Sequence, residues 1–440
     1  MRTDRAAALS FGVAIGLSLV VFWVVGRYQW FIRDDWAFVL TRARVQTLFG
    51  FDDALLTPQD GHLMAVPVLS YRAIDWLVGV DSYWPFLALL LLSHVGCVIA
   101  TRQLCRRVGV TAWMSTLVAT VLLVFGTGWE NILFAVQITY NFSLLAFLLQ
   151  LLLVDHDGRV DRRDIAGSAI GLVGVFSSGF GPFFILGVGV LLASRRRWGA
   201  AVVACAPQFV VWSWWWLTWG SDPAGASGDP TVRMVLRFVR DAVLQTFSGL
   251  TGSMVLAGTG AVVAAAVVVW RGIDTRQRTM LFALWVTTSA MFFGIGLQRS
   301  DVFAGIASRY AYMAAFLLAV PMALAFDQAG RFAPWARWVP RVVLVMAIGR
   351  NAVLLSDRGR DWSARSDAER ITLELVAGTD VPSTVDPALI LLDFSPDVRL
   401  ADVLVLVDEG AIEPRRPTTD EERRRVADVL GLSPADVQGR

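Results

Sequence analysis

Long apolar segments alternate with short polar connections along residues 1–355 of this 440-residue chain. A helix needs about 20 apolar residues to cross the hydrocarbon core of a bilayer. The pattern predicts an all-α polytopic membrane protein with about 11 transmembrane helices. The expected spans are 6–25, 84–101, 110–128, 136–154, 165–177, 182–194, 199–218, 252–270, 280–297, 310–326 and 341–355.

Two of these segments are short and lie on either side of "SSGFGP", residues 177–182. The glycines and the proline there interrupt a helix. Arginine clusters flank both 165 and 194, so a single crossing would leave one cluster outside. We therefore expect two short helices of about 13 residues, each roughly 20 Å long. Neighbouring protein or a thinned bilayer must then cover their tip.

Arginine placement predicts how the chain is oriented in the membrane. Short cytoplasmic loops are enriched in basic residues. The clusters fall where an arrangement of eleven spans with a cytoplasmic N-terminus needs cytoplasmic loops. They are Arg2/Arg5, Arg102/Arg106/Arg107, Arg159/Arg162/Arg163, Arg195–Arg197, Arg271/Arg276/Arg278 and Arg331/Arg337/Arg341. No small-residue cleavage site follows the first span, so we expect it to be a retained anchor.

The long connections would then be extracytoplasmic. These are residues 27–83, 126–135, 219–251 and 298–309. The first contains two amphipathic stretches, 37–49 and 64–79. The third predicts a helix lying on the membrane surface. Its apolar face would carry Val232, Leu236, Val239 and Val243, and its basic face Arg233, Arg237 and Arg240.

The last 85 residues, 356–440, differ from the rest in composition. They hold 18 acids and 11 arginines, a net charge of −7, whereas the remainder carries +9. We expect a small extracytoplasmic α(+β) tail separate from residues 1–355. Its expected elements are helices at 361–376 and 419–430 and a short strand at 388–394. The second helix would begin after Thr419 and end before Gly431.

Composition supports the membrane class and excludes several others. The chain is 55% hydrophobic and 17% charged, with a mean hydropathy of +0.56, whereas soluble domains carry about 25% charged residues. A basic membrane part suits anionic lipids and phosphates. The three cysteines and three histidines are scattered, so neither a disulfide framework nor a Cys/His metal site is expected. No P-loop or Rossmann glycine pattern occurs, and we expect no nucleic-acid partner.

The first candidate for chemistry is the acid pair Asp34-Asp35 in "WFIRDDWAFVL", residues 30–40. Flanking aromatics could lower the local dielectric and raise a carboxyl pKa. One acid would then act as a general base toward a hydroxyl group. The alternative is that an Asp caps a helix that begins at residue 36.

Other polar residues lie in or beside the external loops. Glu130 in "GWENILFAVQITYNF" is followed by Gln137 and Asn141 near one face of the next helix. Such a stripe either hydrogen-bonds neighbouring helices or lines a cavity, and both readings stay open. His62 in "DGHLMAVP" could bind a phosphate or an acid, or could be a surface residue of a turn.

Three arginines lie at the outer ends of spans: Arg299, Arg309 beside Tyr310, and Arg350. Cations there could hold a phosphate by charge-assisted hydrogen bonds. The alternative is that they reach toward lipid headgroups. The tryptophans of residues 210–220 are best explained as an interfacial aromatic belt.

The motifs together resemble a known family. A first span followed by a long external loop with an acid pair, here "RDDW", and an acid in the next external loop, here Glu130 in "GWENI", is similar to the GT-C superfamily of polytopic membrane glycosyltransferases. A bacterial branch fits best, and the resemblance covers residues 1–355. It implies a polyprenyl-phosphate-linked sugar as donor. The amphipathic stretches of the first loop would match juxtamembrane helices of that fold.

The resemblance implies roles for the candidates. Asp34 would be the base of an inverting transfer, Asp35 its neighbour or a ligand, and Glu130 a second acid that orients donor or acceptor. Arg233, Arg237, Arg299 and Arg309 would bind the lipid phosphate. The other expected substrate-binding residues are His62, Arg72, Gln137, Asn141, Tyr310 and Arg350.

The expected partners are the polyprenyl-phosphate-sugar, a glycan, lipid or protein acceptor in the cell envelope, and membrane lipids. No cofactor is expected, and a divalent metal at Asp34/Asp35 is the open alternative. Rival functions are a transporter or flippase of lipid-linked glycans, and a non-catalytic scaffold. A transporter predicts paired broken helices, and the sequence indicates only one break, in 165–194.

Overall fold

The computed structural model describes residues 2–42, 51–220, 230–269, 272–299, 306–329 and 334–437, and the structural statements below concern these residues. They form helices and turns with two isolated β-bridges. The chain divides into two compact units. Unit 1 comprises Met1–Phe22, Leu56–Met64 and Leu90–Arg358, and unit 2 comprises Trp23–Leu55, Ala65–Leu89 and Gly359–Arg440.

Three long helices have residues in both units. They are α1 (Arg2–Gly26), α4 (Trp84–Arg107) and α15 (Trp338–Ala377). The other helices of unit 1 are α5 (Ala112–Leu123), α6 (Glu130–Leu133), α7 (Ile138–Val154), α8 (Arg162–Val175), α9 (Gly181–Ser194), α10 (Trp198–Trp215), α11 (Val232–Thr251), α12 (Met254–Val269), α13 (Thr275–Arg299) and α14 (Ser308–Gln328). Unit 2 adds α3 (Ala65–Val78), α16 (Leu400–Asp408), α17 (Asp420–Leu430) and most of α2 (Phe51–Leu56).

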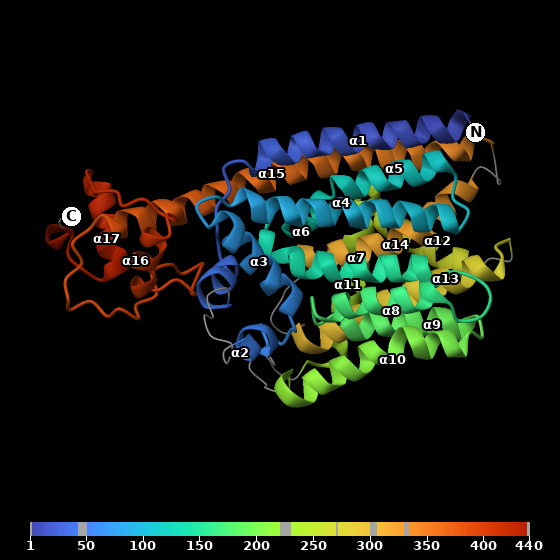
Figure 1. Cartoon of the computed structure of the whole chain (residues 1–440). Coiled ribbons are helices and arrows are strands. Elements are labelled where there is room, and N and C mark those ends of the chain that lie inside the picture. Colours follow the sequence, from blue (N-terminus) through green and yellow to red (C-terminus); the bar gives the residue numbers. More distant parts are fainter. Residues whose placement is uncertain are drawn as a thin grey trace. The chain divides into compact units, whose positions relative to one another are not determined.

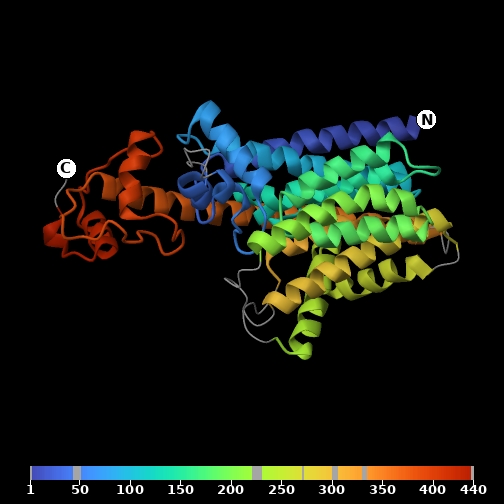
Figure 2. The ribbon, with the colours of Figure 1, turned by 60° about the horizontal axis from the view of Figure 1, so that its bottom comes forward.

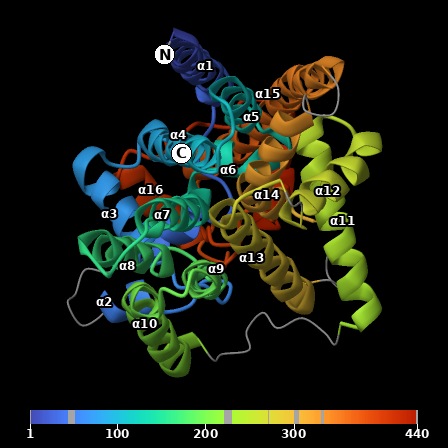
Figure 3. The same cartoon turned by 90° about the vertical axis from the view of Figure 1, so that its right-hand side faces the viewer.

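Unit 1 is a helix bundle built around α14. This helix packs against α5, α11, α12 and α13, and its most apolar stretch is 83% buried, against 22% for that of α10. Helices α8, α9 and α10 pack against one another, and α9 also packs on α13 (Figure 1, Figure 2). Figure 3, which looks along the helices, shows α14 enclosed by α5, α7, α11, α12 and α13.

Every segment that the sequence predicts as a span overlaps a helix. Among the described residues, seven helices are long and apolar enough to cross a membrane, or eight if a bent pair counts as one span. Of the four remaining predicted spans, two overlap the shorter apolar helices α5 and α9, one overlaps α8, and one overlaps α12 of the bent pair. The protein is therefore an all-α, multi-pass membrane protein, whereas the count of eleven and the orientation remain predictions.

The predicted break within 165–194 is confirmed. Helix α8 ends at Val175 and α9 begins at Gly181. A second break lies between α11 and α12, whose axes differ by 102°, at the point where the sequence predicts the end of a surface helix and the start of a span. Gly252 ends α11 in the left-handed conformation, with φ +74°. A glycine can adopt this conformation at little cost, which explains the sharp turn.

The predicted helix at 232–247 exists as α11, and its predicted position on a membrane surface stays a prediction. Val232 is 76% exposed and Leu236 53% exposed. The side chains that pack inward are Val235, Phe238 and Ala242. Helix α11 packs on α12, α13 and α14, so it presents to the bundle an apolar stripe that the sequence pattern did not single out.

Unit 2 joins the C-terminal tail with the segment after the first helix. The boundary expected at 355/356 falls inside α15, which runs unbroken for 40 residues. The amphipathic stretch 64–79 forms α3, whereas 37–49 begins with a π-helical turn, Ala37–Arg42, and continues outside the described residues. Helix α17 begins after Thr419 and ends at Gly431, as predicted.

The strand predicted at 388–394 is wrong. Ile390 forms only an isolated antiparallel bridge with Arg399. Prolines at 387 and 396 flank the segment. A proline cannot donate to a strand ladder, which limits the pairing to this bridge.

Candidate functional site

In unit 1, Glu130 and Arg309 form an ion pair. Glu130 lies at the start of the short helix α6, and Arg309 lies in the first turn of α14. Arg309 Nη1 donates to Glu130 Oε1 at 3.3 Å, and the Arg309 backbone N–H donates to Oε2 at 3.2 Å. Ser308 Oγ also donates to Oε2. These donors hold the carboxylate in one orientation and fix Arg309 beside it.

An aromatic cluster lies against this ion pair. The Arg309 guanidinium carbon is 5.2 Å from the ring centre of Tyr310. The ring centres of Tyr310 and Tyr140 are 6.4 Å apart, and those of Tyr310 and Phe180 are 6.2 Å apart. His62 completes the cluster, with ring centres 6.1 Å from Tyr140 and 6.4 Å from Phe180. Aromatic faces beside a cation suit a ligand with a ring and an anionic group.

The loop between α8 and α9 approaches His62 very closely. A β-carbon placed on Gly179 would lie 2.1 Å from His62 Nδ1. Any side chain at 179 would therefore displace the imidazole. This loop supplies Phe180 to the cluster, so the "SSGFGP" segment, noted in the sequence only as a helix breaker, helps to build the candidate site.

His62 is neutral in this environment. Burial, together with the charges of Arg299 and Arg309, lowers the pKa of His62 to about 4, although the charge of Asp60 opposes the shift. Both arginines are thus close enough to act on the imidazole. His62 can contribute a hydrogen bond to a ligand near neutral pH, but it cannot supply the positive charge that phosphate binding would use.

The polar stripe after Glu130 divides into two roles. Asn141 is buried, donates to the backbone oxygen of Asn131 at 3.0 Å and accepts from the Asn131 side chain at 3.1 Å. It therefore connects α7 to α6. Gln137 is also buried, and its Oε1 receives no hydrogen bond from the residues that the structure describes. Of the two, only Gln137 has an acceptor available to a ligand.

The remaining predicted arginines lie on other helices. Arg233 and Arg237 are exposed on α11. Arg350 is exposed on α15 and donates to the backbone oxygen of Ser248 at 3.4 Å, near the end of α11. Arg72 is half-buried on α3, in unit 2.

In unit 2, Asp35 is completely buried. Tyr71 Oη donates to its Oδ1 at 2.6 Å, and Tyr83 Oη donates to its Oδ2 at 3.0 Å. The backbone N–H of Ile32 also donates to Oδ2, at 3.4 Å. Burial raises the pKa of Asp35 to about 7; the Tyr71, Tyr83 and Ile32 hydrogen bonds oppose the rise, and the charge of Asp34 adds to it.

Asp34 differs from its neighbour because it is half-buried rather than enclosed. Asp35 accepts hydrogen bonds from the phenols of Tyr71, on α3, and of Tyr83, which lies just before α4. It therefore connects this loop to α3 and to the residues before α4. Of the pair, only Asp34 has an exposed part that an acceptor could touch. Asp34 and Glu130 belong to different units.

Sequence reasoning missed Tyr71, Tyr83, Tyr140 and Phe180. Tyr71 lies 36 positions after Asp35 and Tyr83 lies 48 positions after it. A single tyrosine on an apolar helix carries no local signal that it will bond a distant acid. "SSGFGP" was the one visible hint for Phe180.

Two acidic clusters lie elsewhere in unit 1. Asp155 binds Arg107, Arg195 and Arg276. His156, Asp161 and Asp164 have ligand atoms within 4.8 Å of one another, as a metal site would. However, Arg197 Nη2 lies 3.0 Å from Asp164 and 3.2 Å from His156 Nε2. The guanidinium already supplies the positive charge there, so this cluster joins α8 to the start of α10.

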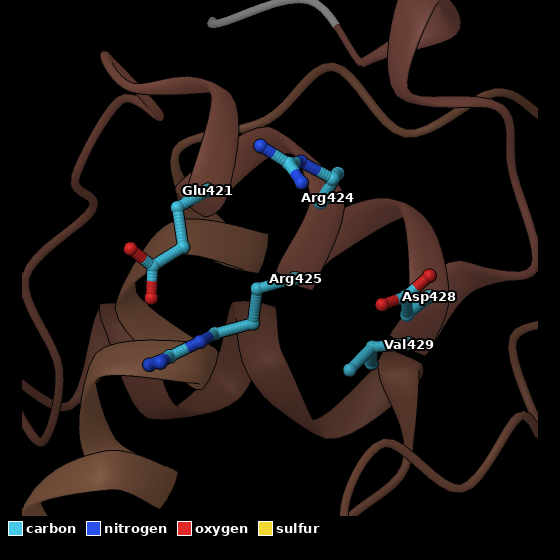
Figure 4. Close-up of a pocket in the computed structure, with 5 residues that line it drawn as sticks. All are labelled: Glu421, Arg424, Arg425, Asp428 and Val429. Atoms are coloured by element: carbon cyan, nitrogen blue, oxygen red, sulfur yellow. The ribbon is translucent and has the colours of Figure 1, made fainter.

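A shallow hollow on α17 has a charged lining. Figure 4 shows charged side chains of both signs projecting from the helix surface, with a single apolar residue among them. The lining residues are Glu421, Arg424, Arg425, Asp428 and Val429. Such a surface is typical of a solvated helix face, and it has no buried polar group that would mark a site.

No protein-family model matches the sequence, and a search of curated proteins also found no match. Among solved structures, this chain is similar to ArnT from Cupriavidus metallidurans, whose crystal structure contains undecaprenyl phosphate. The TM-score is 0.54, the match covers 97% of this chain and 88% of that one, and 13% of the aligned residues are identical. At such low identity the likeness concerns the fold. The chain therefore has a fold similar to that of ArnT, in agreement with the polytopic membrane fold that the sequence predicted.

Proposed function

We propose that this protein is an integral-membrane glycosyltransferase that moves a sugar from a polyprenyl-phosphate donor to an acceptor in the extracytoplasmic cell envelope. The observation that carries the proposal is Arg309, held by Glu130 and lying against Tyr310. Arg309 lies in a chain whose fold is similar to that of ArnT, a protein whose structure contains undecaprenyl phosphate.

Arg309 would bind the phosphate of the donor. Arg299, whose charge also reaches His62, would add a second cation. Guanidinium groups form paired hydrogen bonds with phosphate oxygens and stabilise the negative charge that grows on a departing phosphate. Tyr140 and Phe180 would stack on the sugar or the adjoining lipid, and the free acceptor of Gln137 would bond a sugar hydroxyl.

Asp34 would act as the general base. The acceptor oxygen forms a bond to the anomeric carbon of the sugar while the bond from that carbon to the phosphate oxygen breaks. The acceptor proton passes to Asp34, and the polyprenyl phosphate leaves with the bonding electrons. A single displacement inverts the anomeric configuration. Asp35 is enclosed and would hold the loop rather than touch the acceptor.

A binding experiment tests the phosphate site without knowledge of the acceptor. The protein is reconstituted in zwitterionic nanodiscs, and its melting temperature is measured with increasing undecaprenyl phosphate. A ligand that binds only the folded state raises this temperature. We expect a clear rise in the wild type and almost none in Arg309→Gln.

Matched variants make this result interpretable. Arg309→Gln leaves the buried Glu130 carboxylate without its cation, so the double variant Glu130→Gln/Arg309→Gln is measured beside it. Arg240→Gln replaces an exposed arginine on α11 that pairs with neighbouring Asp241 and should respond like the wild type. A double variant that still responds fully to the lipid would refute the role of Arg309.

The catalytic step needs a transfer assay. Membranes that contain the protein are incubated with radiolabelled polyprenyl-phosphate sugars and the cell-envelope fraction. We expect transfer by the wild type and a loss of at least 100-fold in Asp34→Asn, because general-base catalysis contributes roughly 10²–10⁴-fold. Full transfer by Asp34→Asn would rule out this residue as the base.

A second candidate function is transport of a lipid-linked glycan. The chain has two breaks between consecutive helices, one between α8 and α9 and one between α11 and α12, and these favour a transporter. Paired discontinuous helices are typical of transporter folds. Proteoliposomes loaded with a fluorescent lipid-linked sugar distinguish the two functions. Movement of the lipid across the bilayer without sugar transfer would favour the transporter.

A further inference from the structure

The C-terminal tail bonds the loop that carries the acid pair, and both belong to unit 2. The backbone N–H of Arg33 donates to Ser395 Oγ at 2.6 Å. Ser395 Oγ in turn donates to Glu369 Oε2 at 2.6 Å. Ser395 is completely buried. Glu369 and Ser395 of the tail thus form a chain of two hydrogen bonds that ends at Arg33, the residue before Asp34.

The direction of these hydrogen bonds means that Glu369 orients the Ser395 hydroxyl group. A serine hydroxyl has one proton to donate and lone pairs to accept with. Because Glu369 takes the proton, the lone pairs of Ser395 face the Arg33 N–H. Without an acceptor at 369 the hydroxyl could rotate away and leave that N–H without a partner.

Arg33 has an unusual backbone conformation. Its φ is +54°, in the left-handed region, which costs a residue with a β-carbon roughly 1–2 kcal/mol. Such a conformation persists only where the surrounding structure enforces it. The Arg33 guanidinium carbon also lies 4.8 Å from the ring centre of Phe394, so the tail holds both its backbone and its side chain.

The tail also fixes the start of the same loop. The Trp30 N–H donates to the hydroxyl of the buried Ser366 at 3.3 Å. The loop then turns tightly, because Asp35 N–H donates to Ile32 O at 3.3 Å and Trp36 N–H donates to Arg33 O at 3.0 Å. The backbone of Arg33 therefore sets the direction in which Asp34 leaves the turn.

We propose that Ser395 and Glu369 are positioning residues for Asp34. They act through the backbone of Arg33 and touch no reacting atom. This inference rests on the proposed function, in which Asp34 is the general base. It also gives the tail a role: the tail holds the base in its working orientation.

The test combines an exchange measurement with kinetics on the full chain in nanodiscs. In Ser395→Ala we expect amide hydrogen exchange of a peptide spanning residues 30–36 to speed up at least tenfold. We expect kcat for sugar transfer to fall about tenfold, with KM for the donor unchanged. Ser383→Ala, an exposed serine in a turn of the same tail, should change neither.

Glu369 supplies the conservative comparison. The amide oxygen of Glu369→Gln still accepts the serine proton, so this variant should stay close to the wild type. Glu369→Ala should behave like Ser395→Ala. Equal losses in the Gln and Ala variants would contradict the proposed hydrogen-bond direction. Melting temperatures confirm that each variant is folded.

The two proposals fail in different ways. Unchanged exchange of residues 30–36 in Ser395→Ala, with an active wild type, overturns the positioning role and leaves the proposed function intact. Faster exchange with an unchanged kcat also overturns it. A wild type that binds the donor but transfers no sugar overturns the proposed function, and no base then remains for the tail to position.

Discussion

The phenol of Tyr71 donates a 2.6 Å hydrogen bond to the carboxyl group of Asp35, which is completely buried. Tyr83 donates to the other carboxyl oxygen. An acid so deeply placed is costly to ionise, and two phenols recover only part of that cost. The acid pair therefore consists of two unlike groups: a half-buried Asp34, and an enclosed Asp35 that organises the loop.

Asp35 should make the stability of the protein fall as the pH rises. Burial raises the pKa of Asp35 from 3.8 to about 7. Between these values the folded state binds a proton that the unfolded state has lost, so the free energy of unfolding decreases with increasing pH. The drop begins near pH 4 and ends above about pH 7. Melting temperatures measured from pH 4 to pH 8 check this.

The contribution of Asp35 is isolated by comparison with variants. Asp35→Asn cannot ionise, so its melting temperature should decline less over the same window. Asp393→Asn changes an exposed acid of the tail and should follow the wild type. A parallel decline in the wild type and Asp35→Asn would show that other groups cause the pH dependence.

Removing the Tyr71 hydroxyl should destabilise the ionised form of Asp35. Loss of a hydrogen bond to a charged group costs about 1.5–3 kcal/mol. Tyr71→Phe should therefore lower the melting temperature at pH 8 more than at pH 5. In the Asp35→Asn background the same substitution should cost less, and a double-mutant cycle measures the difference. Additive effects would contradict a direct Tyr71–Asp35 interaction.

Gly179 should not tolerate even a methyl group. A β-carbon at this position would lie 2.1 Å from His62 Nδ1, and overpacking a buried site costs typically about 1–3 kcal/mol. We expect Gly179→Ala to lower the melting temperature and His62→Ala/Gly179→Ala to regain part of the loss. Gly189→Ala is the matched control, because its nearest neighbour would be Cys205 Sγ at 3.9 Å. No difference between the two alanine variants would refute the close approach.

Asp155 should stabilise unit 1 through its three arginines. Burial alone would raise the pKa of Asp155, but hydrogen bonds from Arg276 and Arg195 outweigh it and hold the pKa below its usual value. Asp155→Ala leaves these cations without their shared acid, and breaking a buried ion pair costs roughly 3–5 kcal/mol. Asp157→Ala, whose side chain is 87% exposed, should cost roughly 0.5 kcal/mol or less. Equal melting temperatures for the two variants would contradict this.

The helices were predictable because their signal is local. Each expected span overlaps a helix, and the cap at Thr419 and the stop at Gly431 were predicted correctly. The sequence predicted less where packing between helices decides the outcome. On α11, packing against α12, α13 and α14 buries Val235 and Phe238, which the sequence pattern did not single out. At 388–394 the flanking prolines left only one bridge.

The sequence by itself determined the class of protein, most helix boundaries, and the residue types available for chemistry. Apolar periodicity, caps and breakers act within a few residues, so they can be read along the chain. Only the tertiary structure decided which groups meet: Arg309 with Glu130, His62 with Gly179, and Asp35 with Tyr71. Burial then set the charge states, since desolvation depends on everything that surrounds a group. It made His62 neutral and separated Asp35 from Asp34, two neighbours that the sequence alone could not tell apart.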